Sequence, residues 1–401
     1  MFFPIGDAPN PRGVPFATYA LIAVNVAVFA LVTMPLSAVR PDLSDPAVTE
    51  YLRIITPHLG GRVPLEVFVR ELSAYDLFVF AHGFRPAHPT LQDLFFSLFL
   101  HANFAHLFGN MLFLWIYGDN VEQHLGRLRY LLVYLGTGVA ASAFHALAAM
   151  GSDIPSIGAS GAISGVLGCY FVWFPRNVVR LMLFFPLMTV VLVPARVVLF
   201  LYIVADNLLP FLLSNQATGV AHGAHIGGFF AGLGFAWWSQ RRAVRGTPRN
   251  FAIGARMAPR GDAGSPGQTI AAQIAAGRLA DAAREYFALP AASTRGVLAA
   301  GDGIRLADWL RRAGHPEAAL TVLRRLLRDH PRGPGVAEAH VAAGYALLED
   351  LGEATAAYQH FLDALDLEPD GEIASLARAG IAAIEGRQKR QWGRPYAARG
   401  H

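Results

Sequence analysis

Charge is scarce in the middle of this 401-residue chain. Charged residues make up 15% of the whole, against about 25% in soluble domains, and only nine lie between Leu94 and Gln240. Cys169 is the only cysteine, which excludes an intrachain disulfide. Lys389 is the only lysine beside many arginines, a usage typical of a GC-rich bacterial genome. The scarcity of charge excludes a soluble domain there and indicates a membrane domain, followed by a charge-rich soluble region.

Long apolar runs fill the charge-poor part. About 20 apolar residues cross a bilayer, and we expect a first span that is not cleaved as a signal peptide, because no charged segment precedes it. The fourth span is short, so its start should lie in a protein-lined cavity. The expected fold is all-α, with a polytopic bundle of six membrane helices in residues 1–240 and a soluble helical repeat after it. The predicted spans are Phe16–Leu36, Phe104–Asp119, Leu128–Met150, Gly161–Phe174, Arg196–Leu213 and Val220–Trp238.

Six spans place both termini on one side of the membrane. Arginines near the ends of alternate spans then mark the cytoplasmic face under the positive-inside rule. These arginines are Arg127, Arg129, Arg176, Arg180, Arg241, Arg242 and Arg245. We therefore expect a bacterial inner-membrane protein with cytoplasmic termini, and the second, fourth and sixth spans should begin at the outer side.

The connections between spans carry weaker signals. Residues Ser37 to Asp93 should form short interfacial helices rather than a domain. The apolar segment from Arg180 to Pro194 is broken by two prolines, and we expect it to be an irregular connection at the interface.

A repeat follows the membrane domain. Residues 241–268 are rich in Gly, Pro, Ala and Arg and predict a flexible basic linker. Glycine, alanine and proline then recur 38 residues apart, as Gly314 and Gly352, Ala319 and Ala357, Pro331 and Pro369. This spacing resembles a slightly lengthened tetratricopeptide repeat over residues 269–386. Residues 387–401 should be a basic, disordered tail, and the repeat should recruit a protein partner or substrate.

One short loop carries the first candidate site. Gly158 and Gly161 flank Ser160, so the backbone can turn sharply and other groups can approach the hydroxyl. The amides of Ser160 and Gly161 lie at a predicted helix N-terminus, which favours a developing negative charge. The simpler alternative is close helix packing at small residues.

Polar residues also open the second and sixth spans. His106 and Asn110 are four residues apart and share one helix face. His222 and His225 open the sixth span. Polar groups in a membrane are costly, so a polar cluster at one depth predicts a functional site.

At these residues the sequence resembles the rhomboid intramembrane serine proteases, over roughly Phe16 to Trp238. The stretch Gly118 to Glu122, followed by Gly126 and Arg127, is also similar to that family. The matching residues are His101, His106, Asn110, Gly158, Ser160, Gly161, Ala224, His225, Gly228 and Gly232.

The resemblance implies a serine endopeptidase that cuts membrane-protein substrates in or near a transmembrane helix. Ser160 is then the nucleophile and His225 its base. His106, Asn110 and the Ser160 amide form the oxyanion hole, and Gly158, Gly161 and Gly228 shape the site. No metal, organic cofactor or nucleic acid is expected.

Chemistry supports a dyad independently, because a serine needs only a neighbouring base and no acidic residue accompanies His225 on its span. Asp153 and Asp206 are the alternatives for a third member. Metal binding by the histidines at His101, His106, His222 and His225 is a further alternative.

Two positions depart from the family pattern. Ser164 stands where an aromatic residue often stacks on the histidine, and Gln92-Asp93 stand near the usual Trp-Arg pair. The rival interpretation is a catalytically silent, rhomboid-like scaffold that binds membrane helices and recruits partners through its tail.

Overall fold

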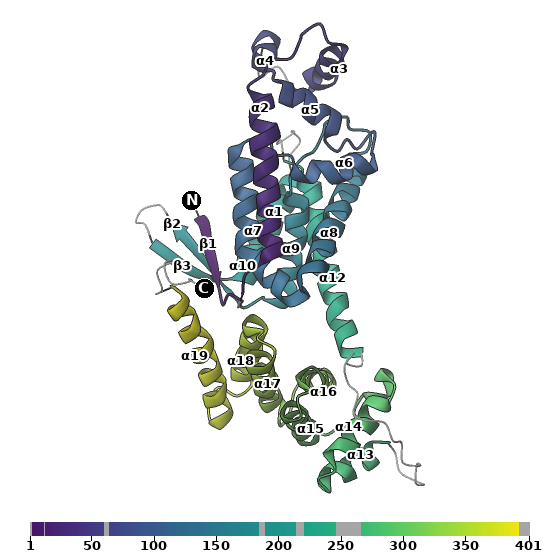
Figure 1. Cartoon of the computed structure of the whole chain (residues 1–401), viewed down its shortest axis with the longest axis vertical. Helices are drawn as coiled ribbons and strands as arrows, with labels where there is room; N and C mark the ends of the chain where they lie inside the picture. The colour runs from purple at the N-terminus through teal and green to yellow at the C-terminus, as the bar shows by residue number, and fades with distance from the viewer. Residues whose placement is uncertain are drawn as a thin grey trace, which may run out of the picture. The chain divides into compact units, whose positions relative to one another are not determined.

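The computed structural model describes residues 2–11, 13–59, 64–183, 189–213, 220–245 and 266–392 of the chain (Figure 1). The chain divides into two compact units. The first contains Met1–Asp7 and Gly13–Ala236, and the second contains Ala8–Arg12 and Trp237–His401.

The first unit is a helical bundle with a small sheet at its side (Figure 1). Helix α9 forms much of its core, since every residue from Gly161 to Tyr170 is buried, and it packs against α7, α8 and α10. The elements are β1 (Phe2–Ala8), α1 (Phe16–Val28), η1 (Phe29–Thr33), α2 (Met34–Ser37), α3 (Pro46–Ile55), η2 (Thr56–Leu59), α4 (Leu65–Glu71), α5 (Ala74–His82), α6 (Leu91–Phe96), η3 (Ser97–Phe99), α7 (Phe104–Leu125), α8 (Arg127–Ala148), α9 (Ser160–Trp173), β2 (Val178–Leu183), β3 (Thr189–Pro194), α10 (Ala195–Ile203), η4 (Val204–Leu208), α11 (Leu209–Leu213) and α12 (His222–Arg245).

Within the described residues, three helical segments are long and apolar enough to cross a membrane. They are Phe16–Ser37, Arg127–Ala148 and Ala195–Leu213. A fourth is added if Leu91–Phe99 and Phe104–Leu125, which meet at 90°, count as one span; Ser160–Trp173 is a shorter apolar helix. Six spans therefore stay a prediction. Large apolar side chains such as Leu31, Leu132 and Leu147 are exposed, as contact with lipid requires.

A buried carboxylate fixes the start of α1 against the end of α7. Glu122 accepts hydrogen bonds from the backbone amides of Ala17 (3.0 Å) and Thr18 (2.8 Å) and from the Thr18 hydroxyl (2.9 Å). The first amides of a helix lack partners within the helix, and a negative charge there is favoured by the helix dipole. Glu122 therefore caps α1 from another helix.

A three-stranded sheet, ordered β1-β2-β3, corrects the expectation of an all-α fold. Strands β2 and β3 pair antiparallel, with Val179 opposite Val193 and Leu181 opposite Val191. The segment that we expected to be an irregular connection is therefore largely a hairpin, although residues 184–188 lie outside the described residues. The two prolines misled the prediction, because Pro194 stands at the end of a strand, where a missing amide is tolerated.

The segment from Ser37 to Asp93 does contain short helices, namely α3, α4 and α5 together with the first residues of α6. One of them, α5, begins with a capping box in which Ser73 and Asp76 exchange hydrogen bonds. Whether these helices lie at the membrane interface stays a prediction.

The second unit is built of antiparallel helix pairs. Gly277, Gly314 and Gly352 end the first helix of successive pairs with φ of +73°, +82° and +72°, the left-handed region that glycine tolerates best. Ala282, Ala319 and Ala357 are fully buried between helices. The elements are α13 (Pro266–Ala275), α14 (Leu279–Ala288), η5 (Ala291–Thr294), α15 (Ala300–Arg312), α16 (Pro316–Asp329), α17 (Val336–Tyr345), η6 (Ala346–Asp350), α18 (Ala354–Leu367) and α19 (Glu372–Trp392).

The helix pairs agree with the repeat spacing read from the sequence, while membership in the tetratricopeptide repeat family stays a prediction. Two boundaries are corrected. Helix α12 continues to Arg245 and α13 begins at Pro266, so both ends of the predicted linker are helical. Helix α19 continues to Trp392, into the segment expected to be disordered. Residues 246–265 and 393–401 lie outside the described residues.

Candidate active site

The loop before α9 is held at both edges. The backbones of Phe84 and Ser156 exchange two hydrogen bonds, of 3.0 and 2.9 Å, and the amide of Gly158 donates to the carbonyl of Ser97 (2.8 Å). Gly158 has φ of +123°, a conformation that side chains rarely allow. These contacts set the point at which Ser160 begins α9.

Ser160 and His225 meet although they are 65 residues apart in the chain. His225 Nε2 lies 2.7 Å from Ser160 Oγ, because α9 and α12 begin at the same level of the bundle. This distance is within the range for direct proton transfer between a nucleophile and its base.

The other ring nitrogen of His225 contacts Asn207 in η4. The distance from His225 Nδ1 to Asn207 Oδ1 is 2.6 Å. The orientation of this amide is defined, since Asn207 Nδ2 donates to the backbone carbonyl of Tyr202 at 2.8 Å. An amide oxygen only accepts, so Nδ1 of His225 carries the proton. The lone pair of Nε2 is therefore directed at the Ser160 hydroxyl.

A π-turn brings Asn207 to this position. The helical stretch from Ala195 to Leu213 is interrupted by η4, and such turns often occur at functional sites because they rotate side chains out of the α-helical register. Asn207 is 1% exposed, and a buried amide is retained only where it is hydrogen-bonded.

His106 and Asn110 lie on the α7 face that approaches the glycine before Ser160. A Cβ placed on Gly158 would stand 2.8 Å from the imidazole of His106 and 3.7 Å from Asn110 Nδ2. Asn110 Nδ2 is buried and has no hydrogen-bond partner within the described residues. An unsatisfied buried donor is costly unless a ligand uses it. This donor is available to an oxyanion.

These groups share one cavity of about 1110 Å³ in the first unit. Ser160, His225, His106 and Asn110 all line it. The wall is completed by apolar side chains from α7, α8, α9 and α11. A cavity of this size can hold an extended peptide segment beside the serine.

Glycines place α9 and α12 in backbone contact. A Cβ on Gly228 would lie 2.0 Å from the carbonyl oxygen of Gly161, and one on Gly232 would lie 1.9 Å from that of Gly165. A Cβ on Gly161 would lie 2.7 Å from Ala141 Cβ of α8. The distance between Ser160 and His225 therefore depends on the absence of side chains one turn below them.

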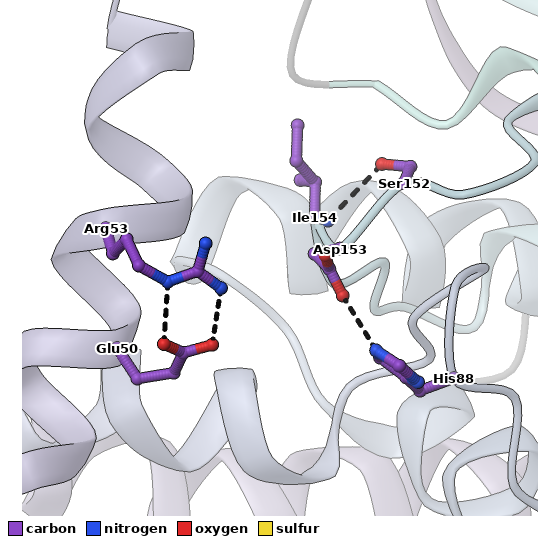
Figure 2. A network of polar contacts seen from close by, with 6 residues as sticks. All are labelled: Glu50, Arg53, His88, Ser152, Asp153 and Ile154. Carbon is purple, nitrogen blue, oxygen red and sulfur yellow. Dashed lines mark hydrogen bonds and ion pairs between the residues drawn. The ribbon is translucent and has the colours of Figure 1, made fainter.

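The two acidic alternatives for a third member lie elsewhere. Asp153 contacts His88, with 3.4 Å between Oδ1 and Nε2 (Figure 2). Asp206 is exposed, and its neighbour Asn207 is the residue in contact with the base. Sequence reasoning did not single out Asn207 as a partner of His225.

Ser164, which stands at the position where an aromatic residue was expected, contacts an aromatic residue of another helix. The Ser164 hydroxyl is 2.7 Å from the Tyr202 hydroxyl, and the Tyr202 ring lies 6.5 Å from that of His225. An aromatic ring therefore stands near the histidine, but it comes from α10 instead of α9. Sequence reasoning had no signal for Tyr202, because tyrosine is common among apolar residues.

The remaining histidines differ in their surroundings. His101 is fully buried, with its ring 5.1 Å from that of His106. His222 and His145 both line the cavity. His145 was not singled out in the sequence, because it lies near the end of the third span, outside the motifs at the starts of spans two, four and six.

The region that contains these residues is similar to known proteins. A family model described as the rhomboid domain matches residues 88–242. Rhomboid protein 1, mitochondrial, of Saccharomyces cerevisiae is 33% identical over 174 residues, which cover 40% of this chain and 45% of that protein. Rhomboid protease GluP of Bacillus subtilis is 32% identical over 163 residues, covering 39% and 27%.

A third relative, the human presenilin-associated rhomboid-like protein, mitochondrial, is 28% identical over 158 residues, covering 37% of this chain and 38% of that protein. The chain thus spans less than half the length of each of these three relatives. The apolar helices and these relatives together indicate an integral membrane protein. Residues 88–242 match the rhomboid domain, and this match and the relatives support placing the chain in the rhomboid family.

Proposed function

We propose that this protein is an intramembrane serine endopeptidase that cleaves membrane-protein substrates in or near a transmembrane helix. The observation that carries the proposal is the 2.7 Å contact between Ser160 Oγ and His225 Nε2 inside a large cavity. A relative named a rhomboid protease supports the same activity.

The reaction follows from the orientation of His225. Ser160 Oγ attacks the scissile carbonyl carbon while Nε2 accepts the hydroxyl proton, and the same nitrogen returns that proton to the leaving amine as the C–N bond breaks. A water molecule then attacks the acyl-enzyme, giving its proton to Nε2, which passes it to Ser160 Oγ as the ester bond breaks. The chain is restored with one water consumed.

The tetrahedral intermediates carry a negative oxygen that needs donors. Asn110 Nδ2, which is buried without a partner, is the first of these. The backbone amide of Ser160 at the start of α9 is the second, because amides at a helix N-terminus are free and favour negative charge. His106 beside Gly158 is the third.

Asn207 acts as a positioning residue for the base. By accepting from Nδ1–H (2.6 Å) it selects the tautomer that leaves Nε2 free to accept a proton. It also disperses part of the positive charge that the ring gains during the reaction. The arrangement is thus a Ser–His pair completed by a neutral amide rather than a carboxylate.

The proposal also includes the sequence predictions for the membrane topology and for the helical repeat. The protein spans a bacterial inner membrane six times, with cytoplasmic termini, and the cavity opens to the outer side. The helical repeat recruits a partner or substrate in the cytoplasm. No metal or organic cofactor takes part in the hydrolysis.

A fluorophosphonate probe, which reacts with activated serines, tests the proposal. The wild-type protein in detergent should become labelled, and Ser160→Ala should lose the label. Ser142→Ala is a matched control, because Ser142 is buried in α8 and should not affect labelling. If the folded wild-type protein does not react with the probe, the rival interpretation as a silent scaffold replaces the proposal.

A further inference from the structure

A histidine pair lies on the second unit, far along the chain from the cavity residues. The Nδ1 atoms of His340 on α17 and His360 on α18 are 3.0 Å apart, and their ring centroids are separated by 5.2 Å. Asp363 follows His360 by three residues on the same helix face, and its Oδ2 lies 3.6 Å from His340 Nδ1. Three potential ligand atoms therefore converge from two packed helices.

From this geometry we propose that His340, His360 and Asp363 bind a divalent transition-metal ion of the zinc class. Zinc takes imidazole nitrogens and carboxylate oxygens at about 2.0–2.1 Å in a tetrahedral arrangement, which places neighbouring ligand atoms about 3.3 Å apart. The two distances above lie on either side of that value. The ligand atoms of all three residues lie within 4.8 Å of one another.

The cluster is accessible from solvent on one side. The side chain of His340 is 16% exposed and that of Asp363 is 38% exposed. An ion can therefore enter without unfolding the helix pair, and the fourth position can be filled by water. Two imidazoles and one carboxylate plus water is a ligand set that zinc accepts.

The repeat itself does not require these residues. Thirty-eight residues before His360 and Asp363, the chain has Val322 and Arg325. Both of those are buried in the preceding pair, at 0% and 1% exposure. Buried or half-buried histidines that the scaffold does not need call for another explanation.

The charged groups near these three residues must also allow a cation to bind. Arg324 acts electrostatically on His360, which opposes binding. The carboxylate of Asp363 supplies a negative charge at the ligands themselves, which opposes the effect of Arg324 on a bound cation.

The bound ion would tie α17 to α18. Metal binding to the folded state alone stabilises that state, and here the stabilisation would be local to one helix pair. The inference is independent of the proposed hydrolysis, because none of the cavity residues takes part.

The test is a zinc titration of the full-length protein in detergent by calorimetry, with hydrogen exchange measured with and without zinc. We expect one binding event that His340→Gln and Asp363→Asn each weaken by at least about 10- to 100-fold, since even residues behind the ligands affect metal affinity that much. Zinc should slow exchange in α17 and α18. His330→Gln is the matched control and should leave binding unchanged.

Asp363→His, which offers another nitrogen ligand, should keep the binding event. Asp363 is partly exposed, so its variants test the site even if a histidine variant fails to fold. Equal zinc binding in the wild type and Asp363→Asn, or no zinc effect on exchange in α17 and α18, would overturn the proposal. The two histidines would then share only a hydrogen bond.

Discussion

The two units of this protein pack their helices by different means. In the first unit, Gly161 and Gly228 bring α9 and α12 into backbone contact. In the second, the buried positions between helices hold alanine and larger apolar residues such as Ala319 and Leu306. Lipid is as apolar as leucine, so membrane helices gain more from close approach than from apolar side chains. In water the apolar side chains themselves supply the stabilisation.

The comparison extends to buried polar groups. The first unit contains buried or half-buried polar side chains at its centre, Asn110, Ser160, Asn207 and His225, arranged around a cavity. In the second unit the histidine pair is half-buried between α17 and α18. We infer that chemistry resides in the first unit and that the second is a scaffold, and the following variants test this division.

Ser160→Ala should have the largest effect. Loss of the nucleophile in comparable serine enzymes costs about 10⁶-fold in kcat, so cleavage of a membrane substrate should become undetectable. This substitution only replaces the hydroxyl group with a hydrogen atom, so the unfolding temperature should be unchanged. Residual cleavage above about 1% of wild type would place the nucleophile elsewhere.

Asn110→Ala should reduce kcat by roughly 10²- to 10³-fold, the cost of one lost oxyanion donor. Steady-state kinetics on a helical substrate would measure it, and KM should change little because the donor acts on the intermediate. Activity within a fewfold of wild type would remove Asn110 from the mechanism.

Asn207→Leu should lower kcat by about 10²-fold, at the lower end of the range for general-base catalysis, with KM unchanged. Asn207→Asp should restore much of the activity, because a carboxylate also accepts from Nδ1–H. A structural role alone predicts equal losses in both variants. That result would contradict the assignment of Asn207 as a positioning residue.

Gly228→Ala should separate α9 from α12, since its Cβ would lie 2.0 Å from a carbonyl oxygen. Overpacking of this kind costs about 1–3 kcal/mol, and the contact between Ser160 and His225 should lengthen, with roughly 10-fold loss of kcat. Gly234→Ala is the matched control on the same helix, because nothing lies within 4 Å of the added Cβ. Equal unfolding temperatures for the two variants would show that the close contact is not required.

Deletion of Gln268 to His401 should have the smallest effect on chemistry. In the proposed topology a bilayer core of about 30 Å separates the repeat from the active site, so cleavage of a minimal helical substrate should change less than a fewfold. Use of a natural substrate or partner should weaken. Loss of most activity in a folded, truncated enzyme would show that the repeat acts on the membrane unit.

Sequence reasoning predicted the site only in part. The spacing of His106 and Asn110 and the flanking glycines of Ser160 are local patterns, so they could be read directly. The meeting of Ser160 with His225 depended on two span starts lying at one level, which alternating spans imply. Asn207 was missed because its contact with His225 depends on the rotation that a π-turn introduces. No residue pattern in the sequence predicts such a turn.

The fold, like the site, could be predicted from the sequence only in part. Apolar spans and turn glycines are repeated local signals, and they predicted the first span and the helix pairs with few errors. The hairpin of β2 and β3 was missed because Val178 to Pro194 is apolar apart from Arg180 and Thr189. Such a run lacks the alternation that distinguishes a half-buried strand from other buried segments, and pairing with β1 is a long-range contact.

The capping of α1 by Glu122 has a consequence for biosynthesis. The two partners are 104 residues apart in the chain, and synthesis proceeds at about 5–20 residues per second. Roughly 5 to 20 seconds therefore pass between translation of Thr18 and translation of the carboxylate that completes the start of its helix. During that interval the first helix must rest in the membrane or the insertion machinery with its leading amides bonded to water, headgroups or another protein. The final position of α1 is therefore fixed only when α7, a later helix, is in place, and not when α1 itself is inserted.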